Sequence, residues 1–122
     1  MIIDNKLPKS ERLNSTNDIS CLFKSKNQIL YEKLTLLFNH QKGTNKSVKI
    51  LISVPKKNHK RAVKRNKIKR LIREAYRRNK HINSSYQGQL YLGICYNFKE
   101  ILHFNEIEEK IKVILQRLNK RI

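Results

Sequence analysis

Residues 56–80 leave this chain few structural options, because they combine a dense positive charge with a regular apolar pattern. The segment holds 13 basic residues and one acidic residue, a net +12, and the rest of the chain carries +7 of the total of +19. Neighbouring like charges on a helix repel one another, so the segment needs a buried apolar stripe in order to fold. Such a stripe is present at helical spacing: Ile68, Leu71, Ile72, Ala75 and Tyr76. We therefore predict a helix over residues 62–80 with one buried side and one basic side.

The basic side of this predicted helix is a candidate binding face for a polyanion. At about 100° per residue, a largely separate arc collects Arg65, Asn66, Lys69, Arg70, Arg73 and Arg77. Guanidinium groups bind phosphate oxygens through paired hydrogen bonds, and residues 55–61 add cations beside the positive N-terminus of the helix. A net charge of +19 also exceeds the magnitude of roughly 2–8 that suits a small soluble domain. Nucleic acid is therefore the expected partner, rather than a membrane or a small-molecule substrate.

The remaining segments predict a small sheet with helices packed on it. Apolar periodicity predicts a capped helix from Ser15, strands over residues 34–38, 48–54 and 90–96, a polar loop over 39–47, and a terminal helix from residue 104. The order of these elements is typical of an α+β domain. We expect residues 1–122 to form a single RNA-binding domain, with residues 1–14 as a flexible basic arm.

The two cysteines and the chain start bear on the cellular compartment. Cys21 and Cys95 have no partner at metal-ligand spacing, so we predict two reduced core thiols, no metal site and a cytoplasmic protein. Residues 1–6 lack the apolar run of a secretory signal. No segment has an apolar run long enough to span a bilayer.

The basic segment also resembles a known family. The sequences VPKK at residues 54–57 and AVKRNKIKRLIREAYR at residues 62–77 are similar to the signature of the protein subunit of bacterial ribonuclease P. The order of the predicted elements agrees with that family as well. The resemblance implies an α-β-β-β-α-β-α fold with a mixed sheet of about four strands and a left-handed βαβ crossover, of the ribosomal protein S5 domain 2-like type.

The resemblance implies a partner and a division of labour. Proteins of this family bind a large catalytic RNA, and the holoenzyme removes the 5′ leader from precursor tRNA. The RNA carries the chemistry with Mg²⁺ that it holds itself, so no catalytic residue and no bound metal are expected in the protein.

The resemblance also implies two binding surfaces. The signature helix and its preceding loop would contact RNA through Lys56, Lys57, Lys60, Arg61, Lys64, Arg65, Asn66, Lys67, Lys69, Arg70, Arg73 and Arg77. A cleft between the first helix and the open sheet face would hold the single-stranded leader through Arg12, Phe23 and Phe38. Strand alternation places Tyr91 on the face opposite Leu90 and Leu92, so we add Tyr91 to this cleft as a stacking platform.

Some positions depart from the family pattern or stay open. Lys67 replaces an arginine of the signature and loses its paired hydrogen-bond geometry, and Ile19 replaces an aromatic residue, which weakens stacking. His59 either contacts phosphate or is a surface residue. Glu106, Glu108 and Glu109 are expected to form a solvated face rather than a metal site. A ribosomal-type RNA-binding protein without an enzyme role is the main alternative, and a helical DNA-binding module is a second one.

Overall fold

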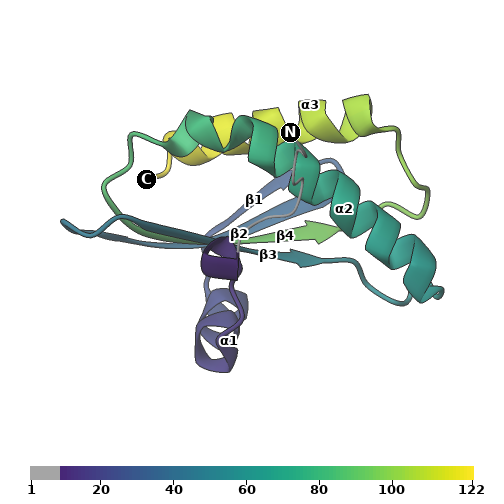
Figure 1. The fold of residues 1–122 in the computed structure, drawn as a ribbon, viewed down its shortest axis with the longest axis horizontal. Helices are drawn as coiled ribbons and strands as arrows, with labels where there is room; N and C mark the ends of the chain where they lie inside the picture. The colour runs from purple at the N-terminus through teal and green to yellow at the C-terminus, as the bar shows by residue number, and fades with distance from the viewer. Residues whose placement is uncertain (1–8) are drawn as a thin grey trace, which may run out of the picture.

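The computed structural model describes residues 9–122 as a four-stranded sheet with helices on both faces (Figure 1). The strands are β1 (Gln28–Tyr31), β2 (Leu34–Lys42), β3 (Ser47–Ser53) and β4 (Gly88–Tyr96). The α-helices are α1 (Thr16–Lys24), α2 (Ala62–Asn79) and α3 (Phe104–Asn119), and two 3₁₀ helices are η1 (Lys9–Glu11) and η2 (Lys80–Asn83). The predicted α+β class and element order are confirmed.

The strand order in the sheet is β1-β2-β4-β3. Antiparallel pairing joins β1 to β2 and β2 to β4, whereas β3 and β4 are parallel and are connected through α2. A parallel pair needs such a crossover because its second strand must start at the same end as the first. Helix α2 therefore connects β3, which precedes it, to β4, which follows it, and these two paired strands fix the position of the basic helix on the sheet.

Helices α2 and α3 cover one face of the sheet, and α1 stands against the other (Figure 1). The main core lies on the α2/α3 face, where alternate strand residues such as Leu36, Ile50 and Ile94 meet the buried stripe of α2. Ile68, Ile72, Ala75 and Tyr76 are buried as predicted, and α2 covers nearly the predicted range. Burial of this stripe offsets the repulsion among the charges on the other side of the helix.

Helix α1 is held by a smaller apolar cluster on the opposite face. Leu22 packs there with Leu13 and Leu37, and its side chain lies over Gly93 of β4. A methyl group added at Gly93 would come within 2.9 Å of the Leu22 Cδ2 atom. The glycine therefore allows α1 to approach the sheet closely. The predicted cap is present, since the Ser15 hydroxyl oxygen accepts a hydrogen bond from the Asp18 N–H at 3.4 Å.

Two boundary predictions are wrong. Strand β2 continues to Lys42 through positions predicted as loop, because its pairing with β4 extends from Leu34 opposite Tyr96 to Lys42 opposite Gly88. Asn39, His40, Gln41 and Lys42 are all polar, so this part of the strand shows no apolar alternation in the sequence. The flexible arm predicted over residues 1–14 is also wrong in its last part. Leu13 is buried and its N–H donates to the Ile50 carbonyl at 2.9 Å. Residues 1–8 lie outside the described residues.

The cysteines differ from the prediction of two core thiols. Both are free, but Cys21 is exposed on α1 and only Cys95 is partly buried. Burial raises the pKa of the Cys95 thiol above its usual range. The prediction of a buried Cys21 is wrong because the nine-residue helix α1 buries only one narrow face, and its other positions, including Cys21, face solvent. None of the helices within residues 9–122 is long and apolar enough to cross a membrane.

Candidate nucleic-acid interface

The predicted RNA-contacting residues lie together on α2 and on the loop that precedes it; we call them the basic helix surface. Eight are exposed: Lys56, Lys57, Lys60, Arg61, Lys64, Asn66, Lys67 and Arg70. Four are half-buried: Arg65, Lys69, Arg73 and Arg77. Val63, 77% exposed, adds an apolar side chain among these cations. The structure thus brings the whole predicted set to one continuous stretch of loop and helix.

The N-terminus of α2 is open to an anion. Its N-cap residue, Arg61, makes no side-chain capping hydrogen bond, and the first turn contains no acidic residue. The first N–H groups of a helix have no partner within the helix, and the helix dipole makes this end positive. Most helices place a hydroxyl or carboxylate there, so its replacement by arginine favours a phosphate from a partner.

Arg65 has a structural contact in addition to its predicted role. Its Nη1 atom donates to the carbonyl oxygens of His59 at 2.9 Å and Lys60 at 2.8 Å. These bonds tie the loop to the first turn of α2. The residue as a whole stays partly exposed to solvent. Arg65 therefore positions the neighbouring cations as well as offering its own charge.

His59 is placed differently from both predicted alternatives. It is only 5% exposed, and its Nε2–H donates to the Phe98 carbonyl oxygen at 2.8 Å. Its ring lies beside Tyr96, with centroids 6.0 Å apart. A phosphate contact and a surface position are both wrong. His59 anchors the basic loop to the core, which sequence could not reveal because the partner lies 39 positions away.

The C-terminal part of α2 carries a charge cluster that reduces its net positive charge. Glu74 accepts hydrogen bonds from Arg77 at 2.7 and 3.0 Å and from Arg78 at 2.9 Å. The bonds from Arg77, together with that from Arg78, hold the pKa of Glu74 below its usual range. Arg77 is thus engaged within the helix, unlike Arg70, which has no ion-pair partner among the described residues.

The basic helix surface meets the edge of the sheet at Arg73. Burial lowers the pKa of the Arg73 guanidinium below its usual range, and the like charge of Arg12 adds to the effect. Arg12 forms a parallel bridge with Ile50 at the edge of β3. Two cations far apart in the sequence therefore lie near enough to influence each other at this edge. A bound phosphate would relieve their repulsion.

The open sheet face beside α1 forms a second candidate surface. Tyr91 lies on this face as predicted, where it packs against the α1 cluster. A hollow of about 200 Å³ is lined by residues of α1, β2 and β4: Asp18, Cys21, Asn39, His40, Gln41, Gln89 and Tyr91. Gln89 donates a hydrogen bond to the Tyr91 hydroxyl. The arrangement offers an aromatic side chain surrounded by amide groups.

Sequence reasoning missed two residues in this region. Register places Asn39 and Lys49 directly opposite Tyr91, one on each neighbouring strand. Their side chains therefore share one face, so that an amide, an aromatic ring and an ammonium group form a row across the sheet. Strand alternation alone could have put Lys49 on this face, but only the pairing shows that it lies beside Tyr91.

The other cleft candidates lie elsewhere. The assignment of Phe38 is wrong, because its side chain is 1% exposed in the main core on the opposite face, with Arg121 over its ring at 5.3 Å. Because side chains alternate along β2, Leu37 rather than Phe38 faces α1. Phe23 is 50% exposed, and at about 100° per residue it projects away from the side of α1 that carries Cys21. Phe23 and Tyr91 therefore flank α1 rather than sharing the hollow.

The acidic residues of α3 are dispersed. Glu106 and Glu109 are exposed, whereas Glu108 accepts a hydrogen bond from the Asn79 amide at 3.3 Å. Within residues 9–122 there is no group of three or more His, Cys, Asp or Glu side chains that could hold a metal ion.

Comparison with known proteins gives a consistent result. A family model described as Ribonuclease P matches residues 7–119. The ribonuclease P protein component of Porphyromonas gingivalis is 34% identical over 119 residues, covering 92% of this chain and 85% of the relative. That of Buchnera aphidicola is 42% identical over 73 residues, covering 60% of this chain and 62% of the relative.

Solved structures agree in fold. The ribonuclease P protein from Thermotoga maritima matches with a TM-score of 0.70 and 29% identity, covering 88% of this chain and 96% of that one. A ribonuclease P protein structure from Staphylococcus aureus matches with a TM-score of 0.67 at 22% identity, covering 90% of this chain and 96% of that one. At the latter identity the match shows a shared fold.

Proposed function

The chain belongs to the ribonuclease P protein component family, which works with an RNA subunit, and we propose that it binds the catalytic RNA and the 5′ leader of precursor tRNA. In this proposal the protein assists endonucleolytic removal of the leader, in the cytoplasm, and has no catalytic residue of its own. The RNA would supply the hydrolytic chemistry with Mg²⁺ that it coordinates itself.

The observation that carries the RNA contact is the distribution of charge on α2. Eight predicted contact residues are exposed on one stretch of loop and helix, and the single acid of that helix is held by Arg77 and Arg78 near its C-terminal end. The N-terminal half is therefore an almost uncompensated positive surface with an open helix N-terminus. Such a surface is destabilising in the free protein and is neutralised by phosphates in a complex.

The leader is assigned to the open sheet face beside α1. A single strand binds through base stacking and backbone charges, and the row formed by Asn39, Tyr91 and Lys49 offers both kinds of contact. Arg12 lies close enough to Arg73 to perturb its pKa, so the charge of α2 continues around the β3 edge. A leader strand that runs from this sheet face to the basic helix surface would therefore remain close to positively charged side chains along its path.

Reconstitution with the cognate catalytic RNA tests the function. At low Mg²⁺ the protein should stimulate 5′-leader cleavage, because its cations replace part of the charge screening that Mg²⁺ otherwise supplies. Binding of the RNA without any stimulation would instead support a ribosomal-type RNA-binding protein. Cleavage by the protein without RNA would contradict the assignment of the chemistry to the RNA.

Paired substrates test the leader surface. Tyr91→Ala and Lys49→Ala should weaken precursor tRNA binding to the holoenzyme about tenfold, as expected for loss of one stacked base or one phosphate contact. Mature tRNA should bind as before, because it has no leader. Equal losses for precursor and mature tRNA would remove this face from the leader path. Phe23→Ala reports separately on the other flank of α1.

A further inference from the structure

A second group of cations lies at the end of the sheet remote from the N-terminus of α2. Strands β3 and β4 are parallel, so both start at one end of the sheet, and α2 runs back to that end between them. Helix α3 ends there as well, since Asn119 at its C-terminus accepts a hydrogen bond from Asn83 at 2.6 Å (Figure 1). The fold thus brings together the loop between β2 and β3, residues 84–87 and the C-terminal end of α3.

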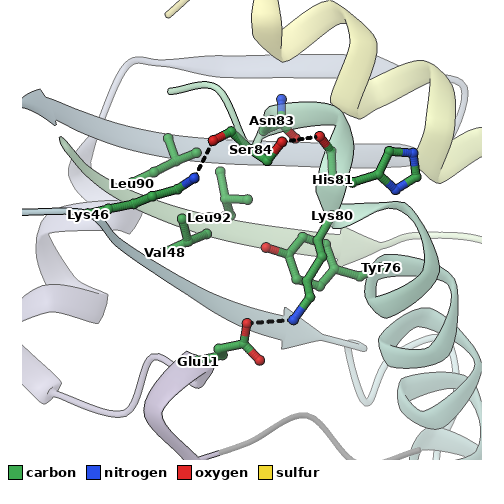
Figure 2. Close-up of a pocket in the computed structure, with 10 residues that line it drawn as sticks. All are labelled: Glu11, Lys46, Val48, Tyr76, Lys80, His81, Asn83, Ser84, Leu90 and Leu92. Carbon is green, nitrogen blue, oxygen red and sulfur yellow. Dashed lines mark hydrogen bonds and ion pairs between the residues drawn. The ribbon is translucent and has the colours of Figure 1, made fainter. Parts of the chain in front are cut away.

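Exposed basic residues of these segments form what we call the second basic surface: Lys42, Lys46, Lys120 and Arg121. None of the four has an ion-pair partner within residues 9–122. The chain has no acidic residue between positions 33 and 73 or after Glu109, so the segments that carry these cations add no negative side chain. Glu11 lines a cavity together with Lys46, but it is paired with Lys80 at 2.8 Å (Figure 2).

The second basic surface contains a polar hollow of about 510 Å³. It is lined by Lys42, Ser85, Tyr86, Gln87, Asn119 and Ile122, and all of these except Tyr86 and Ile122 are exposed. Gly88 allows the close approach of residues 84–87 to β2, because its φ is +133° and a Cβ atom there would lie 2.2 Å from the Gln41 carbonyl oxygen. Ammonium, hydroxyl and amide groups are the ones that contact the sugar–phosphate backbone of a nucleic acid.

Contacts within the protein explain only some of these cations. Lys46 donates to the Ser84 carbonyl oxygen (Figure 2), and Arg121 lies over the Phe38 ring at 5.3 Å. Basic residues at the end of α3 also offset the negative end of its dipole, which accounts for Lys120 and Arg121. Lys42 lies on a strand, so the dipole of α3 does not account for it. Its charge indicates an anionic partner.

We propose that the second basic surface binds the sugar–phosphate backbone of the catalytic RNA, at a contact separate from the basic helix surface. This inference rests on the proposed function. Because side chains alternate along β2, Lys42 lies on the same side of the sheet as Phe38, which belongs to the α2/α3 core. Tyr91 and the proposed leader surface lie on the opposite face, beside α1. An RNA that covers α2 therefore reaches Lys42 without crossing the leader surface.

The two basic surfaces lie at opposite ends of α2. This helix has 18 residues, which at 1.5 Å per residue is about 27 Å. The separation exceeds the Debye length of about 10 Å at 0.1 M salt, so the two surfaces act independently on a bound RNA. Between them, Glu74 pairs with Arg77 and Arg78 and lowers the net charge of the last turns of α2. We therefore expect two separate stretches of protected RNA backbone rather than one.

Removing two charges from the second basic surface tests the proposal in the complex with the catalytic RNA. The test variant is Lys42→Gln/Lys120→Gln. The matched control, Lys33→Gln/Lys112→Gln, also removes two exposed lysine charges, but from the turn between β1 and β2 and from the middle of α3. Filter binding over a salt series measures affinity, hydroxyl-radical cleavage maps the protected RNA backbone, and thermal melting reports folding.

The test variant should reduce the slope of log K against log salt by about two units, because each lost phosphate contact contributes about one. Its affinity for the catalytic RNA should fall about tenfold. One of the two protected stretches should be lost and the other, along α2, should remain. The control should keep both stretches and the wild-type slope. Charge reversal in Lys42→Glu/Lys120→Glu should give the same changes more strongly.

Four outcomes would overturn this assignment. An unchanged slope and footprint in the test variant would exclude the second basic surface while leaving the proposed function intact. Equal losses in the control would show an effect of net charge alone. Weaker binding of precursor tRNA with normal binding of the catalytic RNA would assign the surface to the substrate instead. Failure of the wild-type protein to bind the catalytic RNA would remove the proposed function and this contact together.

Discussion

Arg65 and Arg70 carry the same charge on the same helix but should respond differently to truncation. Arg70 is exposed and has no ion-pair partner among residues 9–122, whereas Arg65 donates to the carbonyl oxygens of His59 and Lys60. Arg65→Ala removes two hydrogen bonds that tie the basic loop to α2. Arg70→Ala removes a charge and little else.

The expected magnitudes follow from those contacts. Two half-exposed hydrogen bonds from a charged donor should contribute about 1–2 kcal/mol to the free energy of unfolding, so Arg65→Ala should lower the melting temperature by about 4–8 °C. Arg70→Ala should change the free energy of unfolding by less than about 0.5 kcal/mol. Each variant should weaken catalytic RNA binding and reduce the slope of log K against log salt by about one unit.

Thermal melting and filter binding over a salt series measure these two effects separately. Arg65→Lys should restore the salt slope, because it keeps the charge, but should regain only part of the stability, because an ammonium group lacks the planar fork. Lys112→Ala, an exposed change on α3, is the matched control and should alter neither quantity. Equal melting temperatures for Arg65→Ala and Arg70→Ala would refute the loop-anchoring role. An unchanged salt slope in Arg70→Ala would remove α2 from the RNA interface.

Three further changes test other parts of the structure. Glu74→Gln should modestly lower the free energy of unfolding at neutral pH, and the difference from the wild type should vanish as pH falls through the lowered pKa of Glu74. Because it removes the negative charge on α2, the same change should also tighten RNA binding, and an unchanged Kd would contradict this. Iodoacetamide should modify exposed Cys21 well before Cys95, whose pKa is raised by burial. Mass spectrometry of the digested protein shows which cysteine is modified first. Equal modification rates would argue against the burial of Cys95. Phe38→Ala should destabilise the protein by about 3–5 kcal/mol, measured by urea unfolding, whereas a stable variant with a leader-binding defect would return Phe38 to the cleft.

The elements and their chemistry were predictable where the determining pattern is local. The stripe from Ile68 to Tyr76 specifies both a helix and the side that it buries, because residues three and four positions apart share a helical face. Alternation in the same way placed Tyr91 opposite Leu90 and Leu92. The family signature lies in this same stretch, so the charge, the helix and the family could be read from one segment.

The pairing of distant segments could not be read in this way. Phe38 and Leu37 are both apolar neighbours on β2, and only the packing of α1 over Gly93 decides that Leu37 faces the α1 side. His59 lies in a basic stretch of the sequence, yet it is buried in the core, where it hydrogen-bonds to the Phe98 carbonyl oxygen. Apolar pattern alone does not say which face of a sheet a given helix covers when both faces are covered.

The sequence by itself determined the basic helix, three of the four strands and the family, since each depends on spacing within a few residues, whereas the short strand β1 (Gln28–Tyr31) was not predicted from its apolar pattern. Only the tertiary structure decided which cations remain available and which are held by Glu74 or by the loop carbonyls. It also decided that Arg12 lies near enough to Arg73 to lower its pKa, although the two residues are far apart in the chain. These features arise where segments far apart in the chain meet, and short-range periodicity carries no information about such contacts.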